Sequence, residues 1–247
     1  MKPVVGMMFK NMLDGIQFYR VYAARCGFDI RFSTVRKSKD DPICRRNFAT
    51  FGDSVSFDAT YNTNRYKMVF IPFTGKDNHG KCVTFGAALL SSENTKSYCW
   101  VLEKFKDCMG WSPSMLITDQ DLALKNAVKH VFPDMRHRLC MWHIMLKFLE
   151  RVPPHLKKDK SLRKNVNKIV WSDVIEPVVF EEKWQEIMSE YGLFDIAWFK
   201  SMYDLRYNWI PAYFRNHSLS GLCRTTSISE SANSFYSSFV NSNCNLV

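Results

Sequence analysis

The sequence predicts an α/β fold: a mixed five-stranded sheet covered by helices and extended by an all-helical segment. Three β-rich runs follow one another between residues 55 and 90, and two short apolar runs alternate with helical patterns between residues 114 and 140. Tryptophans act as apolar anchors over residues 144–220, where the pattern is helical. With 247 residues, 46% of them hydrophobic, the chain can bury the core of one large domain.

Up to residue 90 the sequence predicts one helix, a linker and three strands. Apolar positions at helical spacing predict a helix over residues 7–26, and the charged stretch 36–46 is typical of a linker. The runs VSFDATY, YKMVFIPF and CVTFGAALL follow, separated by NTNR and by the turn-prone segment KDNHGK. Their composition and short connections predict an antiparallel meander.

After residue 90 helices alternate with strands. The predicted elements are a helix over 95–109 ended by Gly110, a strand over 114–119, a helix over 122–131 ended near Pro133, a strand over 136–140 and a helix from His143. The resulting order, three strands and then helix, strand, helix, strand, is the ribonuclease-H-like order. A further 110 residues separate Asp119 from Glu230, so we expect an all-helical insertion over about 144–220 before the last core helix.

Three carboxylates are candidates for catalysis: Asp58, Asp119 and Glu230. Asp58 is predicted in the middle of the first strand, Asp119 at the end of the fourth and Glu230 on the returning helix. If the fold brings them together, their oxygens suit divalent cations such as Mg²⁺ and phosphoryl transfer on nucleic acid. The ordinary alternatives are a strand-edge or turn-facing aspartate for Asp58, a helix N-cap for Asp119, with Asp121 open to either role, and an ordinary helix-face glutamate for Glu230.

Charge and cysteine use restrict the class of protein. The formal net charge is +10, and Lys and Arg outnumber Asp and Glu by ten to four in residues 1–50 and by ten to three in residues 134–168. Such blocks suit a polyanion, although basic helix faces are more often simply solvated. The eight cysteines form no CxxC pair, and no apolar run suggests a signal peptide or a membrane span. We expect a reducing intracellular compartment, no membrane partner, and a nuclear location.

Four stretches in matching order resemble one family: FGDSVSFDATYNTNRYKMVFIPFTG, ITDQDLALKNAV, RHRLCMWHI and TTSISESANSF. Over about Phe51 to Val240 they are similar to the transposase-derived region of plant far-red-impaired-response regulators, which descend from Mutator-like element (MULE) transposases. The resemblance places Glu230 in the acidic element of the family. It implies a nuclear, DNA-associated regulator of transcription, with DNA and other family members, in homo- or hetero-oligomers, as partners.

The resemblance also shows departures. Residues 1–46 are similar to the opening of the family's zinc-finger DNA-binding domain, but only Cys44 follows Lys39 before the transposase-like region, taken as residues 51–247. The SWIM-type finger that the family carries downstream would lie beyond Val247. We therefore expect a truncated or internally deleted member, in which the family implies zinc but most ligands are missing, since one cysteine cannot hold a tetrahedral ion.

A second, weaker zinc candidate is the C-x-x-H pair Cys140 and His143, which matches a motif of this transposase group. His137 and Cys108 are candidate partners, and the alternative is a structural pair at a strand-to-helix junction. The candidate DNA-binding residues are Arg151, Lys157, Lys158, Lys160, Arg163, Lys164 and Lys168. Phosphate contacts need charge and no sequence-specific geometry, and a solvated helix face is an equal alternative.

The leading functional hypothesis is a domesticated transposase that regulates transcription without required catalysis. One alternative is an active DDE-type transposase that uses two divalent metal ions, because all three acids are present. The other alternative is a fragment that dimerises with full-length relatives.

Overall fold

The computed structural model describes residues 43–59, 68–172 and 174–215, and seven isolated residues before them. The chain divides into two compact units, residues 41–244 and residues 1–40 together with 245–247. Within the smaller unit, Asp14, Gly15, Gln17, Phe18, Val21 and Tyr22 are helical and Met7 is not. The other residues of the helix predicted over residues 7–26 lie outside the described residues.

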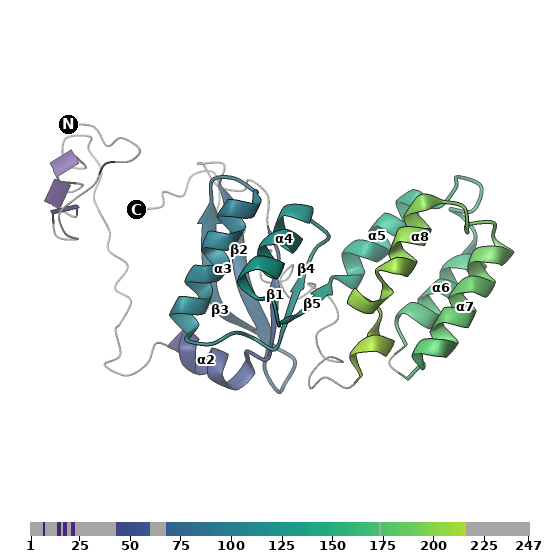
Figure 1. The fold of residues 1–247 in the computed structure, drawn as a ribbon, viewed down its shortest axis with the longest axis horizontal. Coiled ribbons are helices and arrows are strands. Elements are labelled where there is room, and N and C mark those ends of the chain that lie inside the picture. Colours follow the sequence, from purple (N-terminus) through teal and green to yellow (C-terminus); the bar gives the residue numbers. More distant parts are fainter. Residues whose placement is uncertain are drawn as a thin grey trace. The chain divides into compact units, whose positions relative to one another are not determined.

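The larger unit contains the predicted mixed sheet of five strands (Figure 1). The strands are β1 (Ser54–Phe57), β2 (Val69–Lys76), β3 (Cys82–Leu90), β4 (Met115–Thr118) and β5 (Arg136–Leu139). Their spatial order is β3-β2-β1-β4-β5; β2 is antiparallel to β1 and β3, whereas β4 is parallel to β1 and to β5. This topology confirms the ribonuclease-H-like arrangement. Every residue of β1 and β4 is buried, as expected for parallel central strands.

Helices α3 (Thr95–Met109) and α4 (Leu122–Val131) have the bounds that the sequence predicts. Capping residues at their ends account for this agreement. The Asn94 side chain accepts a hydrogen bond from the Ser97 amide at the start of α3. Gly110 ends that helix with φ 86°, a left-handed conformation that favours glycine. Figure 1 shows α3 and α4 beside each other against the sheet.

One helix of the larger unit was not predicted: α2 (Ile43–Phe51) begins within the stretch expected to be a linker. Its Phe48 is 1% exposed and makes edge contacts with the rings of Phe85 and Phe105, at 5.3 and 5.4 Å between centroids. Phe105 of α3 in turn stacks on Phe73 of β2 at 4.0 Å. Because Phe48 belongs to the same core cluster as β1, β2 and α3, helix α2 is part of the sheet domain.

The all-helical segment is confirmed over the described residues. It comprises α5 (Met141–Arg151), α6 (Lys160–Val170), α7 (Pro177–Glu190), α8 (Ala197–Asp204) and the 3₁₀ turns η1 (Arg206–Asn208) and η2 (Pro211–Phe214). These helices share a second core, in which Phe148, Phe180, Phe199 and Trp209 are at most 2% exposed. Trp184 and Trp209 belong to this core, as expected. The predicted last core helix lies outside the described residues.

The end of the helical segment contacts the sheet at β5. Phe214 packs with Met115, Ile117 and Cys140, and the guanidinium groups of two β5 arginines lie over its ring. Arg136 also donates a hydrogen bond to the Tyr213 carbonyl at 2.9 Å. Among the described helices, none combines the length and apolarity that a membrane span requires.

Candidate acidic edge and basic helical face

Asp58 and Asp119 occupy equivalent positions at the carboxyl ends of two neighbouring parallel strands. Ser56 of β1 pairs with Ile117 of β4, so the same register continued by two residues sets Asp58 beside Asp119. The sequence prediction that Asp58 lies in the middle of its strand is wrong, because β1 ends at Phe57. Each aspartate thus follows its strand by one residue, at the edge where α/β sheets commonly bind ligands. We name this position the acidic edge.

The surroundings separate the role of Asp119 from that of Asp121. The Asp121 carboxylate caps helix α4, accepting a hydrogen bond from the Leu124 amide at 2.7 Å. Asp119 is therefore not the N-cap; its Oδ1 accepts from the Asp121 amide at 3.0 Å, which fixes the carboxylate just beyond β4. Asp58 is only 6% exposed and Asp119 is half-buried, so both carboxylates lie where water is restricted.

The buried Thr118 and the half-buried His137 connect β4 to β5 next to the acidic edge. The Thr118 hydroxyl donates to the Asp119 carbonyl at 2.8 Å and lies 2.8 Å from Nε2 of His137. Burial, with a smaller effect from the positive charge of Lys125, lowers the pKa of His137 to about 4. The imidazole is therefore neutral at pH 7. Because the hydroxyl hydrogen is directed at the carbonyl, this hydrogen-bond network assigns the imidazole proton to Nε2.

The negative charge of the acidic edge extends to helix α3. The Tyr98 hydroxyl donates to Oε1 of Glu93 at 3.1 Å. Burial first, then Glu93, Asp121 and Asp119, raises the pKa of Tyr98 above its usual range. A local excess of carboxylates near a buried phenol favours a cation in this region.

The two aspartates supply part of the ligand set that a divalent cation needs. Hard carboxylate oxygens at equivalent ends of adjacent strands are the ligands that Mg²⁺ prefers, and a bound Mg²⁺ would polarise a phosphate and activate water. Within the residues that the structure describes, no three His, Cys, Asp or Glu side chains form a metal-binding group. Glu230, the third predicted ligand, lies outside those residues. The Mg²⁺ site stays a prediction carried by Asp58 and Asp119.

Cys140 and His143 lie at the junction between β5 and α5. Cys140 is buried at the N-cap of α5, and its amide donates to the Thr118 carbonyl at 2.7 Å. The His143 ring packs edge-on against Trp142 at 4.9 Å. Of the expected partners, His137 is directed at Thr118, and Cys108 is exposed in α3. Over the described part of the chain no third ligand completes a zinc site, so zinc also stays a prediction.

The predicted DNA-binding residues are all exposed, and we name them together the basic helical face. Its members are Arg151, Lys157, Lys158, Lys160, Arg163, Lys164 and Lys168. Lys160, Lys164 and Lys168 recur every four residues and so share one side of α6, while Leu162 and Val166 are buried on the other side. Among the described residues, none of the seven forms an ion pair.

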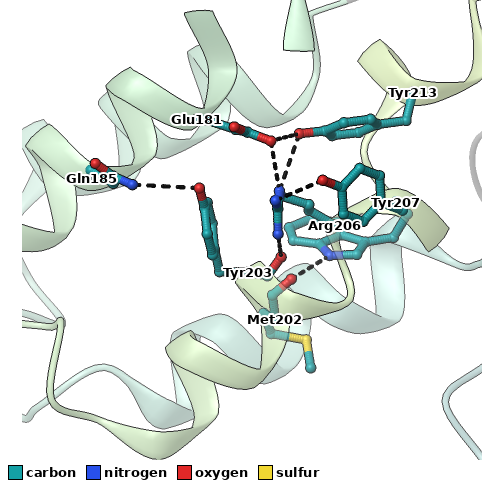
Figure 2. A network of polar contacts seen from close by, with 8 residues as sticks. Glu181, Gln185, Met202, Tyr203, Arg206, Tyr207 and Tyr213 are labelled. Carbon is teal, nitrogen blue, oxygen red and sulfur yellow. Dashed lines mark hydrogen bonds and ion pairs between the residues drawn. The ribbon is translucent and has the colours of Figure 1, made fainter. Parts of the chain in front are cut away.

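The helical segment also holds a polar network that the sequence pattern did not indicate (Figure 2). The Arg206 guanidinium lies over the rings of Tyr203 and Tyr207, at 4.2 and 4.3 Å from their centroids. Its Nε donates to Oε1 of Glu181 at 2.9 Å, and the Tyr213 hydroxyl donates to the same oxygen at 2.6 Å. The network joins α7 to η1 and η2 across separations of 25 and 32 residues, which no local motif encodes.

Comparison with known proteins agrees with this fold. A model of the MULE transposase domain matches residues 54–147, from β1 into α5. The five-stranded topology is consistent with a MULE transposase domain over these residues.

The matches to curated proteins extend further along the chain. Protein FAR1-RELATED SEQUENCE 5 of Arabidopsis thaliana is 36% identical over 208 residues, which are 83% of this chain and 26% of that protein. FAR1-RELATED SEQUENCE 2 is 31% identical over 74% of this chain and 23% of its own length. FAR-RED IMPAIRED RESPONSE 1 is 29% identical over 83% of this chain and 24% of its own length. These two relatives, like the first, are from Arabidopsis thaliana. The chain spans about a quarter of the length of these relatives, and over most of its own length it is a homologue of the FAR1-related sequence and FAR-RED IMPAIRED RESPONSE 1 proteins.

Proposed function

We propose that the chain is a transposase-derived regulator of transcription that associates with DNA in the nucleus and needs no catalysis for this role. The observation that carries the proposal is the homology to FAR1-related proteins over most of the chain. The name of one relative refers to an impaired far-red response.

The basic helical face supplies the physical means of DNA association in this proposal. Residues four apart on a helix lie about 6 Å apart along the axis, so Lys160, Lys164 and Lys168 present three positive charges in a row that can contact the phosphate backbone. None of the three lysines forms an ion pair with a carboxylate of the described residues, so their positive charge remains available to a polyanion. Contacts of this kind position a protein on DNA without selecting a sequence.

Chromatin occupancy in plant cells tests the proposal. The full chain carrying an epitope tag is expected to accumulate in nuclei and to cross-link to chromatin. A variant with Lys160→Ala, Lys164→Ala and Lys168→Ala should lose most of this cross-linking. The control Lys96→Ala, Lys104→Ala and Lys129→Ala removes the same charge from exposed positions of α3 and α4. Cytosolic retention of the unmodified chain, with no DNA bound, would show the proposal to be wrong.

An active DDE-type transposase is the second candidate, favoured by the equivalent positions of Asp58 and Asp119. In that case the two carboxylates would hold the metal ions, while the protein excludes water around the half-buried edge. Strand transfer of terminal-repeat DNA in Mg²⁺ or Mn²⁺ discriminates between the candidates. Product that forms with the unmodified chain and disappears with Asp58→Asn would establish transposition and overturn the claim that the chain works without catalysis.

A further inference from the structure

Ser161 is an exposed serine among the lysines of the basic helical face. It is the second residue of α6, and it precedes Lys164 by three residues, so the two side chains are neighbours on the helix surface. Leu162, the next residue, is buried in the helical core. A charge added to the Ser161 side chain would therefore lie beside the lysines that we propose to contact DNA.

The residues that flank Ser161 in the sequence are mostly basic. The charged residues within four positions of it are five cations and one carboxylate: Lys157, Lys158, Lys160, Arg163, Lys164 and Asp159. Protein kinases select substrates partly by the pattern of charge around the acceptor hydroxyl. A basic pattern on both sides of a serine is complementary to a kinase whose substrate groove carries carboxylates.

This surrounding distinguishes Ser161 from the other serines that the structure describes as exposed. Each of them has at most one lysine or arginine within four positions: Ser91, Ser92, Ser112, Ser114, Ser189 and Ser201. A kinase that requires several basic residues would therefore select Ser161 from this set.

The backbone around Ser161 is held by few contacts. Turns occupy residues 154–158, and α6 begins only at Lys160. The amides of Ser161 and Leu162 lie in the first turn, where no helical carbonyl accepts them, and both donate to Oδ1 of Asp159, at 2.7 and 3.0 Å. Helix ends open locally at a lower cost than helix interiors. A kinase can thus reach the Ser161 hydroxyl when the first turn of α6 opens.

We propose that Ser161 is a phosphorylation site through which a protein kinase of basic specificity weakens DNA binding by the basic helical face. This inference rests on the proposed function. In the reaction, Oγ of Ser161 gives up its proton and attacks the γ-phosphorus of ATP, held with Mg²⁺ by the kinase. The new O–P bond forms as the bond from the γ-phosphorus to the bridging oxygen breaks, and ADP leaves. The serine then carries a phosphate with a charge of about −1.5 to −2 at pH 7.

The phosphate reduces the charge available to DNA in two ways. It places negative charge among the seven cations of the basic helical face and so repels the phosphates of the duplex. It also attracts Lys164, its neighbour on the helix, and thereby competes with DNA for this lysine. Because each lost phosphate contact lowers both the affinity and its salt dependence, the two effects are measurable together.

Phosphorylation in vitro tests whether the folded chain presents Ser161. The full chain is incubated with Mg²⁺, ATP and the catalytic fragment of protein kinase C, and modified residues are located by mass spectrometry. Phosphate is expected on Ser161 and not on Ser201, an exposed serine of α8 with a single neighbouring lysine, Lys200. A free peptide of residues 157–164 is the control for recognition. Phosphate on the peptide but not on Ser161 of the chain would overturn the proposal, and so would a lack of phosphate on both.

The effect on DNA is tested with full chains that carry phosphoserine introduced during synthesis. Phosphoserine at Ser161 should weaken binding of a labelled duplex about tenfold or more, and should reduce the slope of log K against log salt concentration by about 1.4 to 1.8. Phosphoserine at Ser112, which is exposed between α3 and β4, adds the same charge outside the basic helical face and should leave both values unchanged. Ser161→Ala should bind the duplex as the unmodified chain does.

The same titrations separate this inference from the proposed function. If the unmodified chain binds the duplex and phosphoserine at Ser161 does not weaken it, or weakens it no more than phosphoserine at Ser112, this inference alone is wrong. If the unmodified chain binds no DNA, the proposed DNA association is wrong and this inference falls with it.

Discussion

The Thr118 hydroxyl lies 2.8 Å from Nε2 of His137 and donates to the carbonyl of Asp119. One fully buried hydroxyl thus holds together β4, β5 and the backbone that carries a candidate metal ligand. Positioning of Asp119 therefore depends on two residues that would not touch a substrate.

Thr118→Val should destabilise the sheet domain. Valine has nearly the same shape as threonine but leaves the His137 N–H and the Asp119 carbonyl without this partner, a loss of about 1–3 kcal/mol in the free energy of unfolding. Urea unfolding followed by circular dichroism measures the change. Thr95→Val, at a half-buried position in the first turn of α3, is the control and should change stability by about 0.5 kcal/mol or less. Equal stabilities of the two variants would contradict the assigned hydrogen bonds.

Stability should fall as the pH is lowered through the titration range of His137. Its pKa is about 4 in the folded chain, against about 6.5 in an unfolded one, so the unfolded state binds the extra proton more readily. The stabilisation is complete above pH 6.5 and is lost progressively down to pH 4, by about 3 kcal/mol in total. Urea unfolding at several pH values in this range gives the free energy of unfolding as a function of pH. Its slope should be smaller for His137→Gln than for the unmodified chain. If the free energy of unfolding depends on pH in the same way in both proteins, His137 does not have the lowered pKa described above.

Manganese should stabilise the chain through the acidic edge. An ion present at ten times its Kd adds about 1.4 kcal/mol, equivalent to a rise in Tm of about 3–5 °C for a chain of this size. Asp119→Asn should abolish this rise. Asp121→Ala should lower Tm in the absence of metal, because α4 loses its cap, while the response to Mn²⁺ is retained. Identical Mn²⁺ shifts for Asp119→Asn and the unmodified chain would rule out this ligand.

DNA binding should depend on salt in proportion to the phosphates contacted. Each contact contributes about 0.9 to the slope of log K against log salt concentration, so removing Lys160, Lys164 and Lys168 should reduce the slope by about 2.7. Titrations of a labelled duplex at several salt concentrations measure it. The matched triple variant of Lys96, Lys104 and Lys129 should keep the original slope; a reduction of the same size there would point to general charge and not to the basic helical face.

The order of elements could be predicted from the sequence because local signals mark their ends. Asn94 and Gly110 delimit α3, and the bounds of α4 follow from the Asp121 cap. Helix α2 was missed because the charged residues before it are typical of a linker, while its anchoring residue, Phe48, is buried only through contacts made far along the chain. The strand order also places Asp58 and Asp119 directly after two neighbouring parallel strands, although Asp58 was predicted within its strand.

The partners of the site residues could not be predicted in the same way. The pairing of Thr118 with His137 depends on the register of β4 against β5, which no residue pattern specifies. Likewise, Arg206 and Glu181 meet only after α7 and η1 have packed together. Local sequence therefore indicated where the helices and strands begin and end. Tertiary packing determined what the functional side chains contact.

Replacing Arg206 by lysine should destabilise the helical segment although the charge is retained. Lysine cannot place a planar group over both Tyr203 and Tyr207, and it loses the directed bonds to Glu181, so we expect a cost of about 1–3 kcal/mol. The control is the same substitution at Arg215, whose ion pair with Glu176 is more exposed and should contribute less than about 1 kcal/mol. Chemical denaturation of both variants measures the difference. Equal losses in the free energy of unfolding for the two substitutions would show that the Arg206 network contributes no more than an exposed ion pair.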